Sequence, residues 1–413
     1  MSGSSPDSLV VVGASLAGLR AVEAARAAGF DAPITLIGAE QHLPYDRPPL
    51  SKSFLESADA EPTWFCEEKH LADELDVTLK LATPASALDT GAREVQVGDE
   101  RIPYGALIIA TGGHAREMPN PDALTGIYTL RNLQDALAIR ERLIGGADVV
   151  VIGAGFIGSE VAASAIKAGA RVTIVEAAPE PLARAVGAMG GAVARLHERN
   201  GVSLLCGVGV EGFEGRAGAV GAVVLADGRR LPADLVVAGI GMVPAADWLD
   251  GSGVTVDDGV VCDEKLFTGV PGVYAAGDIA NWPNPMFGMR QRMENWTAAA
   301  EQGAAAARNA VAPENAKPYQ TVPYFWSDWY DSRIQFVGVA DPVDEIVVVD
   351  GRPGDSARWT ALYRSGERMV GALTLNGQAD IMKYRAHIMR GGDWTAAIEL
   401  AEQRRARRMA KAG

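Results

Sequence analysis

A strand, turn, helix and strand pattern occurs twice in this chain of 413 residues and restricts the folds available to it. In each copy an apolar run, residues 9–12 or 148–152, leads into a glycine-rich turn, an alanine-rich stretch and a second apolar run ending at an acid. Continuous apolar runs are typical of parallel strands buried on both faces, so each copy predicts a β-α-β unit. Gly29 and Gly169 follow the alanine-rich stretches, as expected where the residue after a helix adopts a positive φ.

The two turns and their acids have the pattern that a dinucleotide needs. The second turn, residues 153–158, is Gly-Ala-Gly-Phe-Ile-Gly, and Glu176 lies 18 residues after its last glycine. In the first turn Ser15 replaces the second glycine, and Glu40 lies 22 residues after the last one. Such a turn lets backbone N–H groups meet a pyrophosphate at the positive end of the helix, while the acid accepts ribose hydroxyls. Two complete copies make ordinary turns with incidental acids the less favoured interpretation.

Further apolar runs and a change of composition complete the expected architecture. Residues 104–110, 235–241 and 273–276 are short runs that end in polar or glycine residues, where open α/β sheets place their ligands. From about Lys317 an aromatic cluster and several strand-like runs precede a helix rich in alanine and arginine. We therefore predict an α/β protein with two Rossmann-type dinucleotide-binding domains and a C-terminal α+β domain.

Composition excludes several classes of protein. Lysine and arginine number 38 against 52 acids, a balance of −14 that argues against general binding to nucleic acid or to an anionic membrane. The three cysteines form no CxxC pair, which excludes a disulfide framework and disfavours a dithiol relay. The five histidines lack metal-ligand spacing, so no metal site is expected. With no run of about 18 uninterrupted apolar residues and no export signal, we expect a cytoplasmic protein outside the membrane.

Several motifs, in this order and spacing, resemble one family over nearly the whole chain. They are the two turns and residues 44–52, 109–112, 238–241, 274–278 and 325–328. The sequence is similar to the FAD-dependent, NAD(P)H-using ferredoxin reductases that supply cytochrome P450s or Rieske oxygenases. The resemblance implies a glutathione-reductase-like arrangement with tightly but non-covalently bound FAD and exchanging NADH. The expected domains are an FAD-binding domain (1–115 and 245–316), an NAD(H)-binding domain (116–244) and a C-terminal α+β domain (317–413).

The resemblance also implies FAD contacts at individual positions. Residues 17–18 should lie at the pyrophosphate, Glu40 at the adenosine ribose, and the Ala85 backbone at the adenine. Asp278 should bond the ribityl chain, and the Trp296 backbone should meet the pyrimidine ring. The expected FAD set is Gly13, Ser15, Leu16, Ala17, Gly18, Glu40, Arg47, Lys52, Ala85, Ala110, Thr111, Gly112, Arg131, Gly277, Asp278, Trp296 and Trp326.

Lys52 and Glu160 are the candidate catalytic residues. In similar proteins Lys52 reaches the flavin edge, where positive charge stabilises the reduced, anionic ring. Glu160 matches a residue near the nicotinamide and is expected to pair with Lys52. Arg47 accompanies Lys52 in the Pro-Pro-Leu-Ser-Lys loop, and Arg131 matches an arginine near the flavin. Trp326 either covers the flavin or packs in a core.

The second turn and its acid form the expected NADH site. Glu176 is followed by two alanines, with no arginine immediately placed for a 2′-phosphate. A carboxylate there repels that phosphate and bonds the free hydroxyls, so NADH is predicted over NADPH, although Arg184 could soften the preference. The expected NAD set is Gly153, Gly155, Phe156, Ile157, Gly158, Glu160, Glu176 and Gly241.

The expected reaction is hydride transfer from NADH to FAD, followed by single-electron transfers to a [2Fe-2S] or similar ferredoxin. One alternative is an NADH oxidase, quinone reductase or monodehydroascorbate-type reductase, with Cys66 as a candidate peroxide-reducing thiol. A dinucleotide-dependent binding protein is a further alternative, without an insertion or targeting signal to support it. The arginine-rich tail is either a solvated helix or part of a basic patch for an acidic ferredoxin. The patch would contain Arg290, Arg292, Arg404, Arg405, Arg407 and Arg408.

Overall fold

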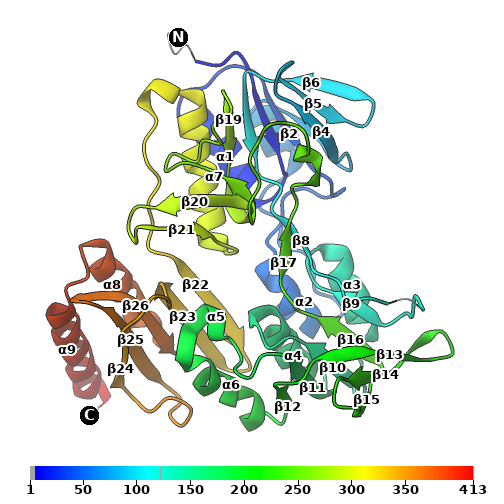
Figure 1. The fold of residues 1–413 in the computed structure, drawn as a ribbon, viewed down its shortest axis with the longest axis vertical. Helices are drawn as coiled ribbons and strands as arrows, with labels where there is room; N and C mark the ends of the chain where they lie inside the picture. Colours follow the sequence, from blue (N-terminus) through cyan, green and yellow to red (C-terminus); the bar gives the residue numbers. More distant parts are fainter. Residues whose placement is uncertain (1–4, 121, 413) are drawn as a thin grey trace. The chain divides into compact units, whose positions relative to one another are not determined.

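The computed structural model describes residues 5–120 and 122–412, which form two compact units. Unit 1 consists of the residues up to Asp46 together with 63–114 and 243–321. Unit 2 consists of residues 47–62 and 115–242 and the residues from Val322 onward. Figure 1 colours the chain by residue number, so each unit can be followed through its separate segments.

Unit 1 is built on a five-stranded parallel sheet. Its order is β19 (Val273–Ala275), β7 (Ala106–Ile109), β1 (Leu9–Val12), β2 (Ile34–Ile37) and β3 (Val77–Lys80). Helix α1 (Leu16–Ala27) connects β1 to β2 and packs beside α7 (Trp296–Val311), as Figure 1 shows. The two helices approach closely because Gly303 lacks a side chain, since an added Cβ would lie 2.1 Å from the Ala17 carbonyl oxygen.

Smaller elements surround this sheet in unit 1. An antiparallel sheet contains β4 (Ala85–Asp89), β5 (Glu94–Val97) and β6 (Glu100–Pro103). A second small sheet contains β18 (Val260–Val261), β20 (Ala280–Asn284) and β21 (Met289–Arg292). Single helical turns are η2 (His70–Glu74), η4 (Asp247–Leu249), η5 (Gly277–Ile279) and η6 (Pro313–Asn315). Strands β8 (Gly113–Ala115) and β17 (Met242–Pro244) contain points where the chain passes from one unit to the other.

Unit 2 contains a second five-stranded parallel sheet. Its order is β12 (Ser203–Cys206), β11 (Arg171–Glu176), β10 (Asp148–Ile152), β16 (Leu235–Ala238) and β9 (Ile127–Thr129). Helix α4 (Phe156–Lys167) connects β10 to β11. The remaining elements of this part are η1 (Pro48–Ser51), α2 (Ser53–Glu56), α3 (Leu133–Arg142), α5 (Ala183–Val186), η3 (Gly187–Met189), α6 (Gly190–Arg199), β13 (Val210–Arg216), β14 (Ala219–Leu225) and β15 (Arg230–Pro232).

The C-terminal part of unit 2 is an antiparallel sheet with two helices. The strand order is β22 (Tyr324–Trp329), β23 (Ser332–Gly338), β26 (Arg368–Leu375), β25 (Trp359–Ser365) and β24 (Glu345–Asp350). Helix α8 (Gln378–Met389) packs on β23 and β26, and α9 (Trp394–Ala412) packs on β24 and β26 (Figure 1). The aromatic cluster that begins this region is therefore a strand.

The predicted α/β fold class, with two Rossmann-type sheets and a C-terminal α+β domain, is confirmed. Gly29 and Gly169 have φ values of +82° and +83°, as expected after helices α1 and α4. The strand predicted over 104–110 is shorter, because β7 contains only Ala106–Ile109. The division into FAD-binding, NAD(H)-binding and C-terminal domains stays a prediction.

Candidate functional site

In unit 1 the carboxyl ends of three neighbouring parallel strands lie at one edge of the sheet. Gly13 follows β1, Ala110 follows β7, and Gly277 lies just beyond β19. Gly13 has a φ of +123°, and an added Cβ would lie 2.1 Å from the Ala110 carbonyl oxygen, so only glycine fits. This edge also carries further unit 1 residues predicted for the flavin nucleotide, namely Ser15, Leu16, Ala17, Gly18, Thr111, Gly112 and Asp278.

The helices that follow the two glycine turns begin without a side-chain cap. Asn132 caps α3 and Asn295 caps α7, but no side chain caps α1 or α4, and α6 and α8 likewise begin without one. The first N–H groups of a helix have no partner within the helix. The helix dipole also favours a negative charge at that end. Both turns therefore fit the pyrophosphate of a dinucleotide.

Ser15 is compatible with this arrangement although it replaces a glycine. Its counterpart in the second turn, Gly155, has an ordinary φ of −79°, and Ser15 has a φ of −119°. A Cβ added to Gly155 would meet only the Gly239 carbonyl oxygen, at an ordinary 3.9 Å. The position needs a small residue rather than a positive φ, and serine satisfies that need.

The remaining unit 1 candidates lie beyond β2 and at the start of α7. Glu40 accepts a hydrogen bond of 2.6 Å from the Tyr45 hydroxyl, and its carbonyl accepts the Ala82 N–H at 2.9 Å, close to Ala85 at the start of β4. Trp296 is the first residue of α7, and its indole N–H donates to Asp46 at 2.9 Å. These side chains belong to the edge elements expected to hold the FAD adenosine and the flavin ring.

Asp278 and Gly277 belong to the short helix η5. The residue at the N-cap position of η5 is Ala276, so Asp278 lies within the helical turn itself. The Gly277 N–H donates to the side-chain oxygen of Gln302 in α7 at 2.9 Å. Gln302 is fully buried and was not anticipated from the sequence.

In unit 2, Lys52 and Glu160 form the ion pair expected from the sequence. Lys52 Nζ lies 2.8 Å from Glu160 Oε2, and the Glu160 side chain is only 4% exposed. Ser51 Oγ donates to the same oxygen at 2.5 Å, and Ser327 Oγ donates to Oε1 at 2.5 Å. Three donors, the Lys52 ammonium group and two serine hydroxyls, therefore converge on the two oxygens of this buried carboxyl group.

The wall beside this ion pair is aromatic and buried. Trp329 donates its indole N–H to Ser327 Oγ at 2.8 Å, and its ring stacks on His197 with a centroid distance of 4.7 Å. Burial lowers the pKa of His197 to about 4, so its ring is neutral at neutral pH. Trp326 points to the opposite face of β22, where it stacks on Tyr324 and is only partly buried.

Arg47 and Arg131 lie together in unit 2. The Arg47 guanidinium donates to the Arg131 carbonyl at 2.8 Å. The Arg131 N–H donates at 2.8 Å to Asp135, which also forms a capping box with Asn132 at the start of α3. A hydrogen bond from a side chain to a backbone carbonyl therefore joins the segment of Arg47 to the separate segment of Arg131.

The candidate NAD site lies at the carboxyl edge of the unit 2 sheet. Glu176 ends β11, and its carboxylate accepts the N–H groups of Ala154 and Ala178, both at 2.8 Å. Gly241 follows β16 with a φ of +100°. Burial raises the pKa of the Cys206 thiol on β12, and the negative charges of Glu176 and of other nearby glutamates raise it further. The acidic surroundings of the turn disfavour a 2′-phosphate, and the preference for NADH over NADPH stays a prediction.

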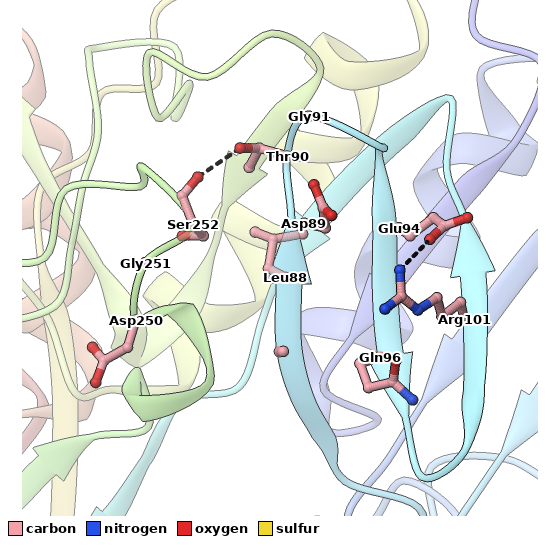
Figure 2. Close-up of a pocket in the computed structure, with 11 residues that line it drawn as sticks. Leu88, Asp89, Thr90, Gly91, Glu94, Gln96, Arg101, Asp250, Gly251 and Ser252 are labelled. Carbon is pink, nitrogen blue, oxygen red and sulfur yellow. Dashed lines mark hydrogen bonds and ion pairs between the residues drawn. The ribbon is translucent and has the colours of Figure 1, made fainter.

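A surface pocket of about 520 Å³ lies elsewhere in unit 1 (Figure 2). It is lined by β4–β6 and residues 250–252, with Arg101 paired to Glu94 at 3.4 Å and Thr90 bonded to the Ser252 carbonyl at 2.6 Å. None of the residues predicted for FAD or NAD lines it. The pocket therefore does not mark the candidate site.

The three cysteines bear on the alternative of a small-molecule reductase with a reactive thiol. Cys66, Cys206 and Cys262 are all free thiols. Burial and the charge of Glu23 raise the pKa of Cys66, which reduces its thiolate fraction and disfavours a peroxide-reducing role.

Within residues 5–120 and 122–412, no group of three or more His, Cys, Asp or Glu side chains could hold a metal ion. No helix in the same ranges is long and apolar enough to cross a membrane.

Sequence reasoning did not single out Ser51, Ser327, Trp329 or His197. Ser51 and Ser327 lie inside the Pro-Pro-Leu-Ser-Lys and Phe-Trp-Ser-Asp motifs, so the sequence pattern that could have indicated both serines is that of the two motifs. His197 lies in an ordinary amphipathic helix and carries no comparable signal.

Comparison with known proteins gives the same family over most of the chain. The profile described as "Pyridine nucleotide-disulphide oxidoreductase" matches residues 7–303, and the profile described as "Reductase C-terminal" matches residues 324–409. The chain is 37% identical over 393 residues to the anthranilate 1,2-dioxygenase system ferredoxin–NAD(+) reductase component of Burkholderia cepacia, covering 94% of this chain and 95% of that relative.

Two further similarities extend over most of the chain. Rhodocoxin reductase of Rhodococcus erythropolis is 35% identical over 381 residues, covering 92% of this chain and 88% of that relative. Among solved structures, the covalent putidaredoxin reductase–putidaredoxin complex matches with a TM-score of 0.88 and 30% identity, over 97% of this chain and 99% of that chain.

Proposed function

The chain belongs to the pyridine nucleotide-disulphide oxidoreductase family and to its ferredoxin reductases, and we propose that it transfers electrons from NADH to a ferredoxin. The family expected from the sequence motifs is thereby confirmed, and it is one of flavin- and NAD(H)-dependent enzymes. In the proposed reaction NADH gives up a hydride, two ferredoxin molecules each gain one electron, and NAD⁺ and a proton are released.

The observation that carries the proposal is the pair of glycine turns, each lying between a parallel strand and a helix, with an acid at or just beyond the end of the next strand. Two such turns in one chain suit one retained and one exchanging dinucleotide. Tightly bound FAD would supply the chemistry, because flavin can accept two electrons together and release them singly. We propose that the unit 1 turn holds the FAD pyrophosphate and that Glu40 holds its ribose.

Lys52 and Glu160 have distinct proposed roles. Lys52 would place positive charge beside bound FAD, and Glu160 orients the Lys52 ammonium group through their 2.8 Å contact. Two serine hydroxyls donate to the Glu160 carboxyl group and hold it in place beside Lys52. The other flavin contacts expected from the resemblance, Arg47, Arg131, Asp278 and Trp296 among them, are proposals of the same kind.

The second turn is the proposed NADH site, with Glu176 as the residue that selects NADH over NADPH. Both carboxylate oxygens of Glu176 accept backbone N–H groups at the turn, so the carboxylate is held there. A fixed carboxylate accepts ribose hydroxyls but repels a 2′-phosphate. Residues 153–158 would hold the pyrophosphate at the start of α4.

We also propose that the ferredoxin is acidic and meets basic residues of the C-terminal helix. Arg405 and Arg407 of α9 are exposed, whereas Arg404 and Arg408 are partly buried against acids of their own domain. In this proposal, Arg405 and Arg407 supply the positive charge of α9 that meets the ferredoxin. A cytoplasmic location is part of the same proposal, because the proposed reaction requires both NADH and a ferredoxin partner.

The proposed function is tested by titrating the purified protein anaerobically with NADH and then adding an oxidised [2Fe-2S] ferredoxin. We expect a flavin spectrum that bleaches with NADH and recovers as the ferredoxin is reduced. A protein that is colourless and takes up no added FAD would contradict the proposal. Faster turnover with oxygen or a quinone than with any ferredoxin would favour the small-molecule reductase instead.

A further inference from the structure

Strand β22 supplies the donor that completes the hydrogen bonding of the Glu160 carboxylate. Ser327 Oγ lies 2.5 Å from Glu160 Oε1 and 2.8 Å from Trp329 Nε1. An indole N–H can only donate, so Ser327 accepts from Trp329, and its own hydroxyl proton is left for Glu160. The indole thereby sets the direction of the serine hydroxyl.

The Trp329 ring is itself held by a buried histidine. Trp329 and His197 are fully buried, and their rings stack at 25°. His197 Nε2 lies 3.0 Å from Ser159 Oγ, and His197 Nδ1 lies 2.7 Å from the Tyr330 hydroxyl. Since both ring nitrogens are engaged, the imidazole cannot rotate without leaving a buried polar group without its partner. The plane of the indole is fixed with it, and Phe156 packs against the same ring.

Burial makes the direction of the Ser327 hydroxyl important. Glu160 is 3% exposed and Ser327 is fully buried, so water cannot replace a lost donor. A buried carboxylate that loses one charge-assisted hydrogen bond interacts more strongly with its remaining donors, Ser51 and Lys52. The position of the Lys52 ammonium group, and how strongly Glu160 offsets its charge, therefore depend on Ser327, which donates to Glu160 and not to Lys52.

We propose that Trp329 is a positioning residue for electron transfer, acting through Ser327 on Glu160 and thereby on the Lys52 ammonium group. The inference rests on the proposed function, in which Lys52 supplies positive charge to the reduced flavin. Without the indole N–H, the Ser327 hydroxyl is no longer polarised and held toward Glu160, so it donates more weakly and Glu160 interacts more strongly with the Lys52 ammonium group. Lys52 would then present less positive charge to bound FAD, and reduction by NADH would be slower.

The kinetic test compares Ser327→Ala, Trp329→Phe and the double variant. Phenylalanine keeps the aromatic stack on His197 but removes the N–H donor. We expect each single variant to lower the single-turnover rate of flavin reduction by about tenfold, the size of one lost charge-assisted hydrogen bond. The double variant should be no slower than Ser327→Ala alone, because Trp329 acts only through that serine. A wild-type rate in Trp329→Phe, or independent effects that multiply, would overturn the inference.

The matched control is Trp359→Phe. Trp359 is 1% exposed in β25 of the same sheet, so the substitution makes the same change of side chain in the same domain. We expect its rate of flavin reduction to equal that of the wild type. A tenfold loss in this variant as well would show that any buried Trp→Phe change disturbs the site, and the specific role of Trp329 would be lost.

A spectroscopic readout does not depend on turnover. With tryptophan indoles labelled with nitrogen-15, the Trp329 N–H resonance is identified by its absence in Trp329→Phe. Ser327→Ala should shift that resonance and speed its exchange with solvent, with or without FAD added. An unchanged resonance would overturn the inference even if the rates fall. If the wild-type flavin is not reduced by NADH, the proposed function fails, whereas the resonance still decides whether the Trp329–Ser327 contact exists.

Discussion

The Asp380 carboxylate accepts a hydrogen bond of 2.6 Å from the Arg408 guanidinium of the C-terminal helix. Asp380 is 1% exposed, and Arg404 and Arg358 contact the same carboxylate. Arg408 also contacts Asp350 in β24. The basic segment expected to face a ferredoxin is therefore used in part to attach α9 to its own domain.

Replacing Asp380 by asparagine should destabilise the protein. The substitution keeps the shape of the side chain but leaves three guanidinium groups around an uncharged amide. Breaking a buried ion pair in this way costs about 3 kcal/mol or more of unfolding free energy. Asp355→Asn is the control, because Asp355 is 68% exposed and its arginine contacts are 3.7 Å and 3.8 Å long. Denaturant unfolding of both variants measures the difference, and equal losses would contradict the prediction.

Reversing the charges of Arg405 and Arg407 should weaken ferredoxin docking. Both side chains are exposed, so Arg405→Glu with Arg407→Glu changes the surface without removing a contact to Asp380. We expect the KM for an acidic ferredoxin to rise about tenfold at low salt and the difference to shrink as salt is added. Reduction of a small dye such as ferricyanide should stay unchanged. Equal effects on dye and ferredoxin would remove this surface from the docking proposal.

Removing the Glu176 carboxylate should narrow the preference for NADH. Without it, a 2′-phosphate meets less repulsion and the ribose hydroxyls lose an acceptor. We expect Glu176→Ala to reduce the ratio of kcat/KM for NADH to that for NADPH by about tenfold. Glu141→Ala, an exposed acid on α3, makes the same change in net charge away from the turn and should leave the ratio intact. A wild-type preference for NADPH would reject the assignment of Glu176.

The buried His197 should make stability depend on pH. Burial lowers its pKa from 6.5 to about 4, so between these values the unfolded chain binds a proton that the folded protein does not. Its contribution to stability is thus complete above about pH 6.5 and declines as the pH falls toward 4, by about 3 kcal/mol in all. His197→Asn should flatten this part of the profile of unfolding free energy against pH. His114→Asn, at an exposed position, is the control, and a profile unchanged by His197→Asn would contradict the prediction.

The glycine turns show which features could be predicted from sequence. Gly13 and Gly153 must adopt positive φ values, of +123° and +99°, and lie close to the backbone of a neighbouring strand. Both requirements concern a single residue and its immediate neighbours. The glycines and the apolar runs before them are therefore sufficient to predict the two turns. The acids are similarly placed by their strands, because Glu40 lies just beyond β2 and Glu176 is the last residue of β11.

The network around Glu160 shows what could not be predicted. Ser51 and Ser327 are common residues, and they lie 109 and 167 positions from Glu160 in the chain. Whether a serine donates to a distant carboxylate depends on which surfaces pack together, and no local pattern encodes that. Trp329 and His197 take part for the same reason, because their stacking joins β22 to α6.

The sequence by itself determined the two nucleotide turns, the strands that present them and the acids at their ends, because backbone conformation and burial of apolar runs are local properties. Only the tertiary structure decided which donors complete the Glu160 carboxylate and which arginines of α9 remain exposed. Hydrogen bonds and ion pairs form between whichever polar groups the packed core brings within reach. Arg404 and Arg405 are neighbours in sequence, yet one faces a buried aspartate and the other faces solvent.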